Sequence, residues 1–246
     1  MPWSRASQLD RTLQCPGHLS LPHIRDLSDS AQASADYGTM VHNWKETGIV
    51  SGSQSHEKTF AKKLEILKKN NISREYLWPT TGYHEVTFAY NCVDGRVGVC
   101  WLSGKAAVEA FKNQYNDEWV TGTADYVGVD STGHLWVDDL KTGMSFDSSA
   151  DEMAQMYYYA MVWSKYHRDI VRPVNVTTTH WVKYPLESLP VRSPDLYLTQ
   201  DKLLKFEKYL CKVYADYKAG KRKFNLGVEC DYCPAVLACP LQQKEI

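Results

Sequence analysis

The sequence predicts an α/β fold, and three observations support this prediction. Segments with helical periodicity alternate along the chain with segments whose apolar residues recur at every second position. Two of the extended segments are joined by a tight turn at residues 131–133. The 246 residues are enough to bury a full core. We therefore expect a single domain over residues 1–246, with at most a small appended lobe.

Charge and cysteine content exclude several classes of protein. The net charge of −1 excludes a wholly basic surface that coats DNA, so any contact with nucleic acid must come from local patches. We see no apolar run of signal-peptide or membrane-span length, so we expect a soluble, cytoplasmic protein without a membrane partner. The seven cysteines are odd in number, which favours metal ligation or burial over a disulfide framework.

Apolar periodicity and capping residues define the helices. The first ends where Cys15-Pro16-Gly17 interrupts it, and the third should turn its leucines inward and its lysines outward. The fourth begins at the capping-box spacing Ser149-Ala150-Asp151-Glu152. Residues 103–115 read as a partly helical excursion. The expected helices are Ser7 to Gln14, Asp36 to Thr47, His56 to Asn70, Ser149 to Tyr166 and Thr199 to Ala219.

Alternating and β-branched segments define the strands. They are Tyr83 to Tyr90, Arg96 to Leu102, a hairpin from about Trp119 to Lys141, and Val174 to Tyr184. Within the hairpin, Asp130 and His134 close a three-residue loop in which Gly133 takes the left-handed conformation. This register places Asp125 opposite Asp139.

Strand parity identifies the carboxylate that works in this hairpin. Asp139 and Lys141 leave the backbone on one face, whereas Asp138 and Leu140 leave on the other. Asp125 and Asp139 then lie close together, and such a pair is costly unless a cation lies between them. We therefore interpret the hairpin as a divalent metal site for phosphodiester hydrolysis.

Four further side chains are candidates for this site. His42 is a lone helical histidine, which is more often structural than a ligand. Glu85 either supports the metal from a neighbouring strand or is an exposed strand residue. Gln155 and Tyr159 lie one helical turn apart, so both can face one site, and a primary amide suits holding a phosphate or a base.

The cysteines near the C-terminus suggest a second metal centre. Cys230, Cys233 and Cys239 can present three thiolates to one centre, and Cys15 is the natural fourth ligand. Four thiolates suit iron or zinc, although one N-terminal and three C-terminal ligands favour an iron-sulphur cluster. Burial explains the remaining cysteines, Cys92, Cys100 and Cys211.

The densest basic cluster follows the last helix and comprises Lys218, Lys221, Arg222 and Lys223. It is either a solvated end of the helix or a DNA contact.

Taken together, the motifs resemble the RecB-type branch of the PD-(D/E)XK nucleases. The resemblance is to its iron-sulphur members, such as AddB nuclease domains and the CRISPR-associated exonucleases. The matching segments span Cys15 to Cys239 in the family's order: Gly38 to His42 for Gly-x-x-x-His, Gly122 to Asp125 for Gly-x-x-Asp, Asp139 to Gly143 for Asp-x-Lys-Thr-Gly, Gln155 to Tyr159 for Gln-x-x-x-Tyr, and the four cysteines.

The resemblance implies a restriction-endonuclease-like core, a central mixed β-sheet flanked by helices, in one RecB-like nuclease domain. Residues 1–35 and 224–246 would form a lobe that binds a structural [4Fe-4S] cluster through Cys15, Cys230, Cys233 and Cys239. The implied ligands of Mg²⁺ or Mn²⁺ are His42, Asp125, Asp139 and the backbone carbonyl of Leu140.

The resemblance also assigns catalytic roles, to Asp125, Asp139, Lys141, Gln155, Tyr159 and Glu85. Lys141 would position or deprotonate the attacking water, helped by a pKa that a neighbouring cation lowers. Gln155 and Tyr159 would orient the strand. Asp138 replaces Asp139 in these roles only if the strand register shifts.

The function implied is a metal-dependent DNA exonuclease that prefers single-stranded ends. The alternatives are a non-catalytic or partner-dependent DNA-binding module of a recombination or helicase complex, and a zinc-stabilised nucleic-acid-binding protein. The sequence lacks a phosphate-binding Gly-x-x-x-x-Gly-Lys loop, so ATP-driven unwinding would need a helicase partner. The oligomeric state stays open.

Overall fold

The computed structural model describes residues 3–22, 29–79, 81–102, 105–142, 153–168, 172–181, 185–225, 233, 235 and 238–241. Its helices are α1 Leu9–Gln14, α2 Asp29–Thr47, α3 Gln54–Lys69, α4 Arg74–Leu77, α5 Lys105–Lys112, α6 Ala154–Tyr166 and α7 Gln200–Lys218, with two 3-10 helices at Ala6–Gln8 and Pro16–Ser20. Its strands are β1 Ser4–Arg5, β2 Tyr83–Asn91, β3 Val97–Cys100, β4 Trp119–Val129, β5 Leu135–Lys141, β6 Val174–His180, β7 Val191–Arg192 and β8 Leu196–Leu198.

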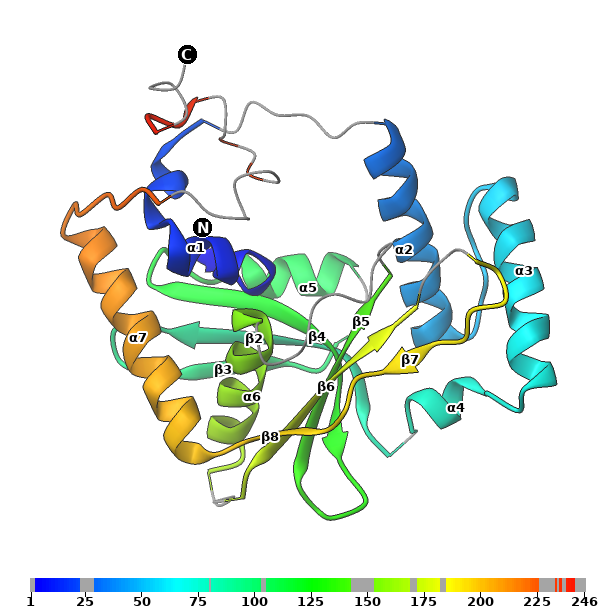
Figure 1. Cartoon of the computed structure of the whole chain (residues 1–246). Helices are drawn as coiled ribbons and strands as arrows, with labels where there is room; N and C mark the ends of the chain where they lie inside the picture. Colours follow the sequence, from blue (N-terminus) through cyan, green and yellow to red (C-terminus); the bar gives the residue numbers. More distant parts are fainter. Residues whose placement is uncertain are drawn as a thin grey trace.

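The strands form one mixed sheet with helices around it (Figure 1). The order along the sheet is β3-β2-β4-β5-β6-β7, with β1 beside β4 and β8 beside β6. β5 runs parallel to β6 and β1 parallel to β4, whereas the remaining pairs are antiparallel. The predicted α/β class with a central mixed sheet flanked by helices is confirmed.

Two apolar cores cover the two faces of β5, as its alternating pattern requires. Leu135 and Val137 pack with α6 and α7 in the larger core. Trp136 and Leu140 face the other way, into a core that α2 and α3 build from aromatic side chains. In this second core the ring of Phe60 stacks on that of Trp181. The sheet is therefore clamped between helices, and polar groups near its centre are shielded from water.

The predicted β4–β5 hairpin is confirmed in both turn and register. Gly133 has a φ of +82°, and the backbone N–H of Asp130 donates to the carbonyl of His134 at 2.9 Å. The ladder ends with Tyr126 opposite Asp138, so Asp125 and Asp139 are the next residues beyond the last pair.

One edge of β4 is shared by two different strands. β1 pairs with it at Val120 and Thr121, whereas β5 pairs with it from Tyr126 to Val129. Between them, residues 122–125 have no strand partner on this edge among the described residues. The Gly-Thr-Ala-Asp segment of the sequence fills this interval, so its backbone is open to side chains from elsewhere.

Local sequence explains where the outer helices begin and end. Ser53 caps α3 by accepting the backbone N–H of His56, and Thr199 caps α7 by accepting that of Lys202. Gly48 follows α2 with a φ of +74°, as expected for a residue just past a helix end.

Several expectations need correction. α2 begins at Asp29, seven residues before the expected start at Asp36. The sequence patterns did not reveal β1, α4, β7 and β8, because segments of two to four residues are too short to show periodicity. The capping box at residues 149–152 lies outside the described residues.

We expected every lysine of α3 to point outward, but one of them points inward. Lys63 is fully buried, and its Nζ donates to the hydroxyl of Ser188 at 2.8 Å. Burial lowers the pKa of Lys63 to about 8. Its hydroxyl partner lies 125 positions along the chain, a distance that local pattern cannot reveal. Among the described residues, no helix is long and apolar enough to span a bilayer.

Candidate active site

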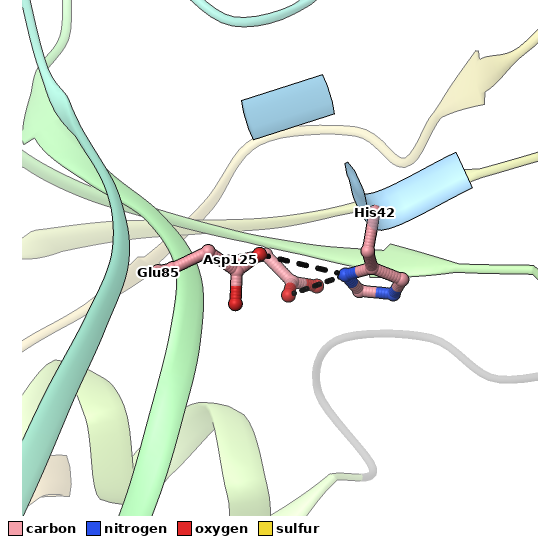
Figure 2. Close-up of side chains that lie close together, drawn as sticks. All are labelled: His42, Glu85 and Asp125. Carbon is pink, nitrogen blue, oxygen red and sulfur yellow. Dashed lines mark ion pairs between the residues drawn. The ribbon is translucent and has the colours of Figure 1, made fainter. Parts of the chain in front are cut away.

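A compact polar group lies where α2, β2 and β4 meet, and Figure 2 shows its three members. His42 Nδ1 is 3.1 Å from Asp125 Oδ1 and 3.5 Å from Glu85 Oε1. Their ligating atoms all lie within 4.8 Å of one another, which suits a shared metal ion. The group joins two residues expected to be ligands, His42 and Asp125, with Glu85, which was expected only to support the metal.

Glu85 lies in β2 with a φ of +54°, a conformation that a non-glycine residue rarely adopts inside a strand. The β2–β4 ladder pairs the residues on either side of Glu85 and omits Glu85 itself. The face alternation of β4 also breaks here, since Ala124 and Val127 both enter the larger core although three positions separate them. This backbone distortion brings the carboxylate of Glu85 beside that of Asp125.

Lys45 is a member of the site that the sequence did not reveal. Its side chain is fully buried, and Nζ lies 3.1 Å from Glu85 Oε1 and 3.7 Å from Asp125 Oδ1. Nζ also donates to the backbone carbonyl of Asp125 at 2.5 Å. The available signal was its position three residues after His42, which places both on one face of α2.

The charges of this group reinforce one another. Burial acts to lower the pKa of His42, but the charge and hydrogen bond of Asp125 outweigh it and raise that pKa to about 10. Burial acts to raise the pKa of Asp125, yet Lys45 and His42 hold that pKa well below its usual range. Asp125 is therefore a carboxylate, and a metal ion that binds His42 must displace a proton.

A second polar network lies at the end of β5 and the start of α6. Asp139 Oδ2 is 2.6 Å from Lys141 Nζ, and Asp139 Oδ1 accepts from Gln155 Nε2 at 3.2 Å. Gln155 Oε1 accepts from Lys141 Nζ at 3.1 Å. Asp139, Lys141 and Gln155 are therefore in direct contact with one another. Tyr159, the fourth residue expected to act with them, accepts a hydrogen bond from Gln155 Nε2 at 3.0 Å.

The pKa of Lys141 is governed by its ion pair with Asp139. Burial alone would lower it, but the ion pair with Asp139 raises it above the usual lysine value. Burial raises the pKa of Asp139, although Lys141 opposes the effect. Beside Asp139, Lys141 is therefore an ammonium group suited to holding a phosphate or a water.

Asp125 joins the two networks across the sheet. The backbone N–H of Leu140 donates to Asp125 Oδ2 at 2.5 Å. The next carbonyl along β5, that of Lys141, accepts the N–H of Trp181 on the β6 side. Because successive carbonyls of a strand alternate in direction, the Leu140 carbonyl points toward β4 and the side of Asp125. This direction suits the ligand role expected for it.

Asp138, the alternative acid, belongs to a separate network on the other face. It accepts hydrogen bonds from Trp78 Nε1 at 2.8 Å, Thr177 Oγ1 at 2.5 Å and Thr179 Oγ1 at 3.0 Å. Burial raises the pKa of Asp138 to about 6, although these donors and Arg192 oppose the shift. The choice of Asp139 by strand parity agrees with this arrangement, because the oxygens of Asp138 are already engaged.

Two glycines of the sequence motifs allow neighbouring segments to pack closely at the site. A Cβ on Gly122 would lie 2.3 Å from that of Ala6 and 3.0 Å from the ring of Tyr159. With no side chain at Gly122, the Tyr159 hydroxyl reaches the carbonyl of Thr123 and donates to it at 2.6 Å. This contact fills the interval of the β4 edge that lacks a strand.

Gly38 plays a similar part on α2. A Cβ there would lie 2.6 Å from Thr142 Oγ1. The helix that carries His42 therefore packs directly against the end of β5, which carries Asp139 and Lys141.

Asp10 also contributes to the site, although no motif in the sequence pointed to it. Asp10 Oδ1 accepts the backbone N–H of Ala154 at 2.7 Å, at the first residue of α6. Burial raises the pKa of Asp10, while Lys141 acts to lower it. The N-terminal helix α1 thereby fixes the start of the helix that carries Gln155.

The donor set fits a hard divalent cation. Two carboxylates and one imidazole suit Mg²⁺ or Mn²⁺, and the nitrogen makes Mn²⁺ the more favourable. The carboxylates of Glu85 and Asp125 both lie within 3.5 Å of His42 Nδ1, so a cation bound among the three side chains would offset the like charges of the two carboxylates.

The described residues include three of the four cysteines expected to bind the cluster. Cys15 follows α1, and its Sγ accepts the backbone N–H of Asn225 at 3.5 Å. The N–H of Gly17 donates to the carbonyl of Lys223 at 2.9 Å, so the N-terminal segment lies beside the start of the C-terminal segment. Cys230 lies outside the described residues. The described cysteines Cys15, Cys233 and Cys239 form no compact ligand group, so the [4Fe-4S] cluster and the lobe that would bind it stay predictions.

The protein therefore has an α/β fold in which strands β4 and β5 of the mixed sheet diverge, and acidic residues, a histidine and a lysine lie at the point of divergence. The chain belongs to the PD-(D/E)XK nuclease superfamily, whose family model matches residues 3–240. Membership indicates a nuclease.

The comparisons with individual proteins are weaker. The crystal structure of SSO0001 is similar with a TM-score of 0.45 and 13% identity, over 98% of this chain and 87% of that one. A protein from Eubacterium rectale, provisionally named an exonuclease, has a TM-score of 0.45 and 11% identity over 90% of this chain and 76% of its own. No curated protein matches the sequence significantly.

Proposed function

We propose that the protein is a metal-dependent DNA exonuclease that acts on single-stranded ends. The observation that carries this proposal is the juxtaposition of the His42, Glu85 and Asp125 group with the Asp139, Lys141 pair across the β4–β5 junction. Membership of a nuclease superfamily supports the reaction class. The preference for DNA, and for single-stranded ends, follows from the resemblance to RecB-type enzymes.

His42, Glu85 and Asp125 would hold Mg²⁺ or Mn²⁺, with Asp139 and the Leu140 carbonyl on the facing strand. A metal ion bound there would supply an activated water and offset charge on the phosphate. Lys141, as an ammonium, would donate to a phosphate oxygen or to the attacking water. Gln155 fixes Lys141 and Asp139 relative to each other through its amide. Their orientation is thus set before substrate arrives, which favours a rapid reaction.

The test uses four substrates: end-labelled linear DNA and covalently closed circular DNA, each single-stranded and double-stranded. The protein is purified without oxygen and incubated with Mg²⁺, Mn²⁺ or EDTA. We expect metal-dependent release of short products from linear single strands and no cut in circular ones. Cleavage of circles would contradict the exonuclease assignment. Metal-independent binding without any cleavage would favour a DNA-binding module of a larger recombination or helicase complex.

We further propose a structural [4Fe-4S] cluster held by Cys15, Cys230, Cys233 and Cys239. The support is the one-plus-three cysteine pattern and the contact between the segments around Cys15 and Asn225. A cluster joining residues so far apart would restrict the unfolded chain and stabilise the fold. We expect a brown protein with visible absorbance, and a colourless, poorly soluble Cys233→Ala variant. Zinc without iron in elemental analysis would overturn this proposal.

A further inference from the structure

Lys45 Nζ lies among three oxygens that belong to proposed metal ligands. The contacts are 2.5 Å to the Asp125 carbonyl, 3.1 Å to Glu85 Oε1 and 3.7 Å to Asp125 Oδ1. A fully buried ammonium is costly unless paired, and here its ion-pair partners are the carboxylates of the site itself. An oxygen-lined position of this kind would equally suit a hard metal cation.

We propose that Lys45 takes the place of a second divalent cation, so that the site binds one metal ion. This inference rests on the proposed metal-dependent function. Lys45 is a positioning residue: its ammonium holds Glu85 and the Asp125 backbone at the point where β2 and β4 depart from regular pairing. The distorted carboxylate of Glu85 is thereby kept beside His42.

The charges at the site favour one metal ion over two. The site holds three carboxylates and two ammonium groups: Glu85, Asp125, Asp139, Lys45 and Lys141. With His42 neutral, as a metal ligand must be, one divalent cation leaves a single net positive charge. The negative charge of one bound phosphodiester offsets it. A second divalent cation would leave excess positive charge in a buried region, where charge is poorly screened.

The strongest alternative is that Lys45 merely stabilises the fold as a buried ion pair. That role would make Lys45 resemble Lys63, which is also fully buried but lies on α3 with its ammonium on a serine hydroxyl. The partner of Lys63, Ser188, is not one of the proposed metal ligands. Lys63 therefore provides a matched control for the loss of a buried lysine.

The experiment counts Mn²⁺ bound to the full-length protein without DNA, by electron paramagnetic resonance. Wild type should bind one Mn²⁺ per chain at this site. Lys45→Ala removes the ammonium and leaves room for a hydrated ion, so it should bind two, with the spectrum of a coupled Mn²⁺ pair. Lys45→Arg keeps the charge and should bind one, as should Lys63→Met. If Lys45→Ala does not fold by circular dichroism, Lys45→Ser replaces it.

A single Mn²⁺ bound by a folded Lys45→Ala or Lys45→Ser variant would overturn the inference. The proposed function fails separately: a wild-type protein that binds no Mn²⁺ would contradict the metal site itself, and with it the role given to Lys45. A wild type that binds one Mn²⁺ but cuts no DNA would contradict the nuclease proposal and leave the Mn²⁺ counts to decide the role of Lys45.

Discussion

Asp125 Oδ2 accepts the backbone N–H of Leu140 at 2.5 Å, just beyond the last paired residues of β4 and β5. A side chain thus takes over a bond that a strand would otherwise supply. The same carboxylate also contacts His42 through its other oxygen. Asp125 therefore both holds the two strands where they separate and supplies an oxygen to the candidate metal group.

The adjacent acids Asp138 and Asp139 offer a matched pair of substitutions. Asp139→Asn removes a charge beside Lys141 and should reduce cleavage of linear DNA by about a hundredfold or more. Asp138→Asn alters a network on the opposite face and should leave cleavage within about tenfold of wild type. Initial rates with end-labelled DNA measure both. Equal losses in the two variants would contradict the assignment by strand parity.

The raised pKa of Asp138 predicts a specific dependence of stability on pH. Its pKa is about 6 in the folded protein, against an ordinary value of 3.8. The folded state therefore binds the proton more tightly, and this stabilising contribution is complete below pH 4 and lost as pH rises through 6. The shift corresponds to about 3 kcal/mol.

Urea unfolding in EDTA between pH 4 and pH 7 tests this expectation. Wild type should lose stability relative to Asp138→Asn as pH rises, because the asparagine cannot ionise. Parallel curves for the two proteins over that range would show that Asp138 has an ordinary pKa.

Two neighbouring tyrosines of α6 separate a role in the site from a role in packing. Tyr159 OH donates to the Thr123 carbonyl and accepts from Gln155, whereas Tyr158 OH donates to the Val120 carbonyl. Tyr159→Phe frees Gln155 and should lower kcat by about tenfold to a hundredfold. Tyr158→Phe loses a similar buried bond, costing about 1 kcal/mol of stability, with kcat unchanged. Similar kcat values for the two variants would count against the role given to Gln155.

The contact between Gly38 and Thr142 can be tested by a double-mutant cycle. Gly38→Ala places a Cβ 2.6 Å from Thr142 Oγ1 and should push α2 away from β5, lowering both stability and cleavage. Thr142→Ala removes that oxygen, and the nearest remaining atom, Thr142 Cβ, is 3.7 Å away. We expect the double variant to recover most of the activity that Gly38→Ala loses. Additive losses would show that the two residues act independently.

Local pattern predicted those parts of the site that depend on strand geometry. The turn at Gly133 fixes the register of β4 against β5, and in that register Asp125 and Asp139 are the next residues beyond the last pair. The period of two then distinguishes Asp139 from Asp138. Such inferences succeed because a hairpin is built from residues close together in sequence.

The roles of Lys45 and Asp10 could not be predicted from local sequence patterns. Lys45 reads as an ordinary helical lysine, and its carbonyl partner lies 80 positions away. Asp10 fixes the start of a helix 144 positions downstream. The distorted backbone of Glu85 is equally invisible in its strand, because only the packing of β2 against β4 and α2 imposes it. Long-range contacts of this kind follow from the tertiary fold.

The β4 edge that β1, α6 and β5 share has a consequence for how the protein is made. Residues from position 4 to position 159 meet there, so no early portion of a nascent chain can assemble the site. Contacts between segments so far apart form late in folding. Chains that end before residue 159 should therefore lack the assembled site, so that these unfinished copies do not cut nucleic acid in the cell that makes the protein.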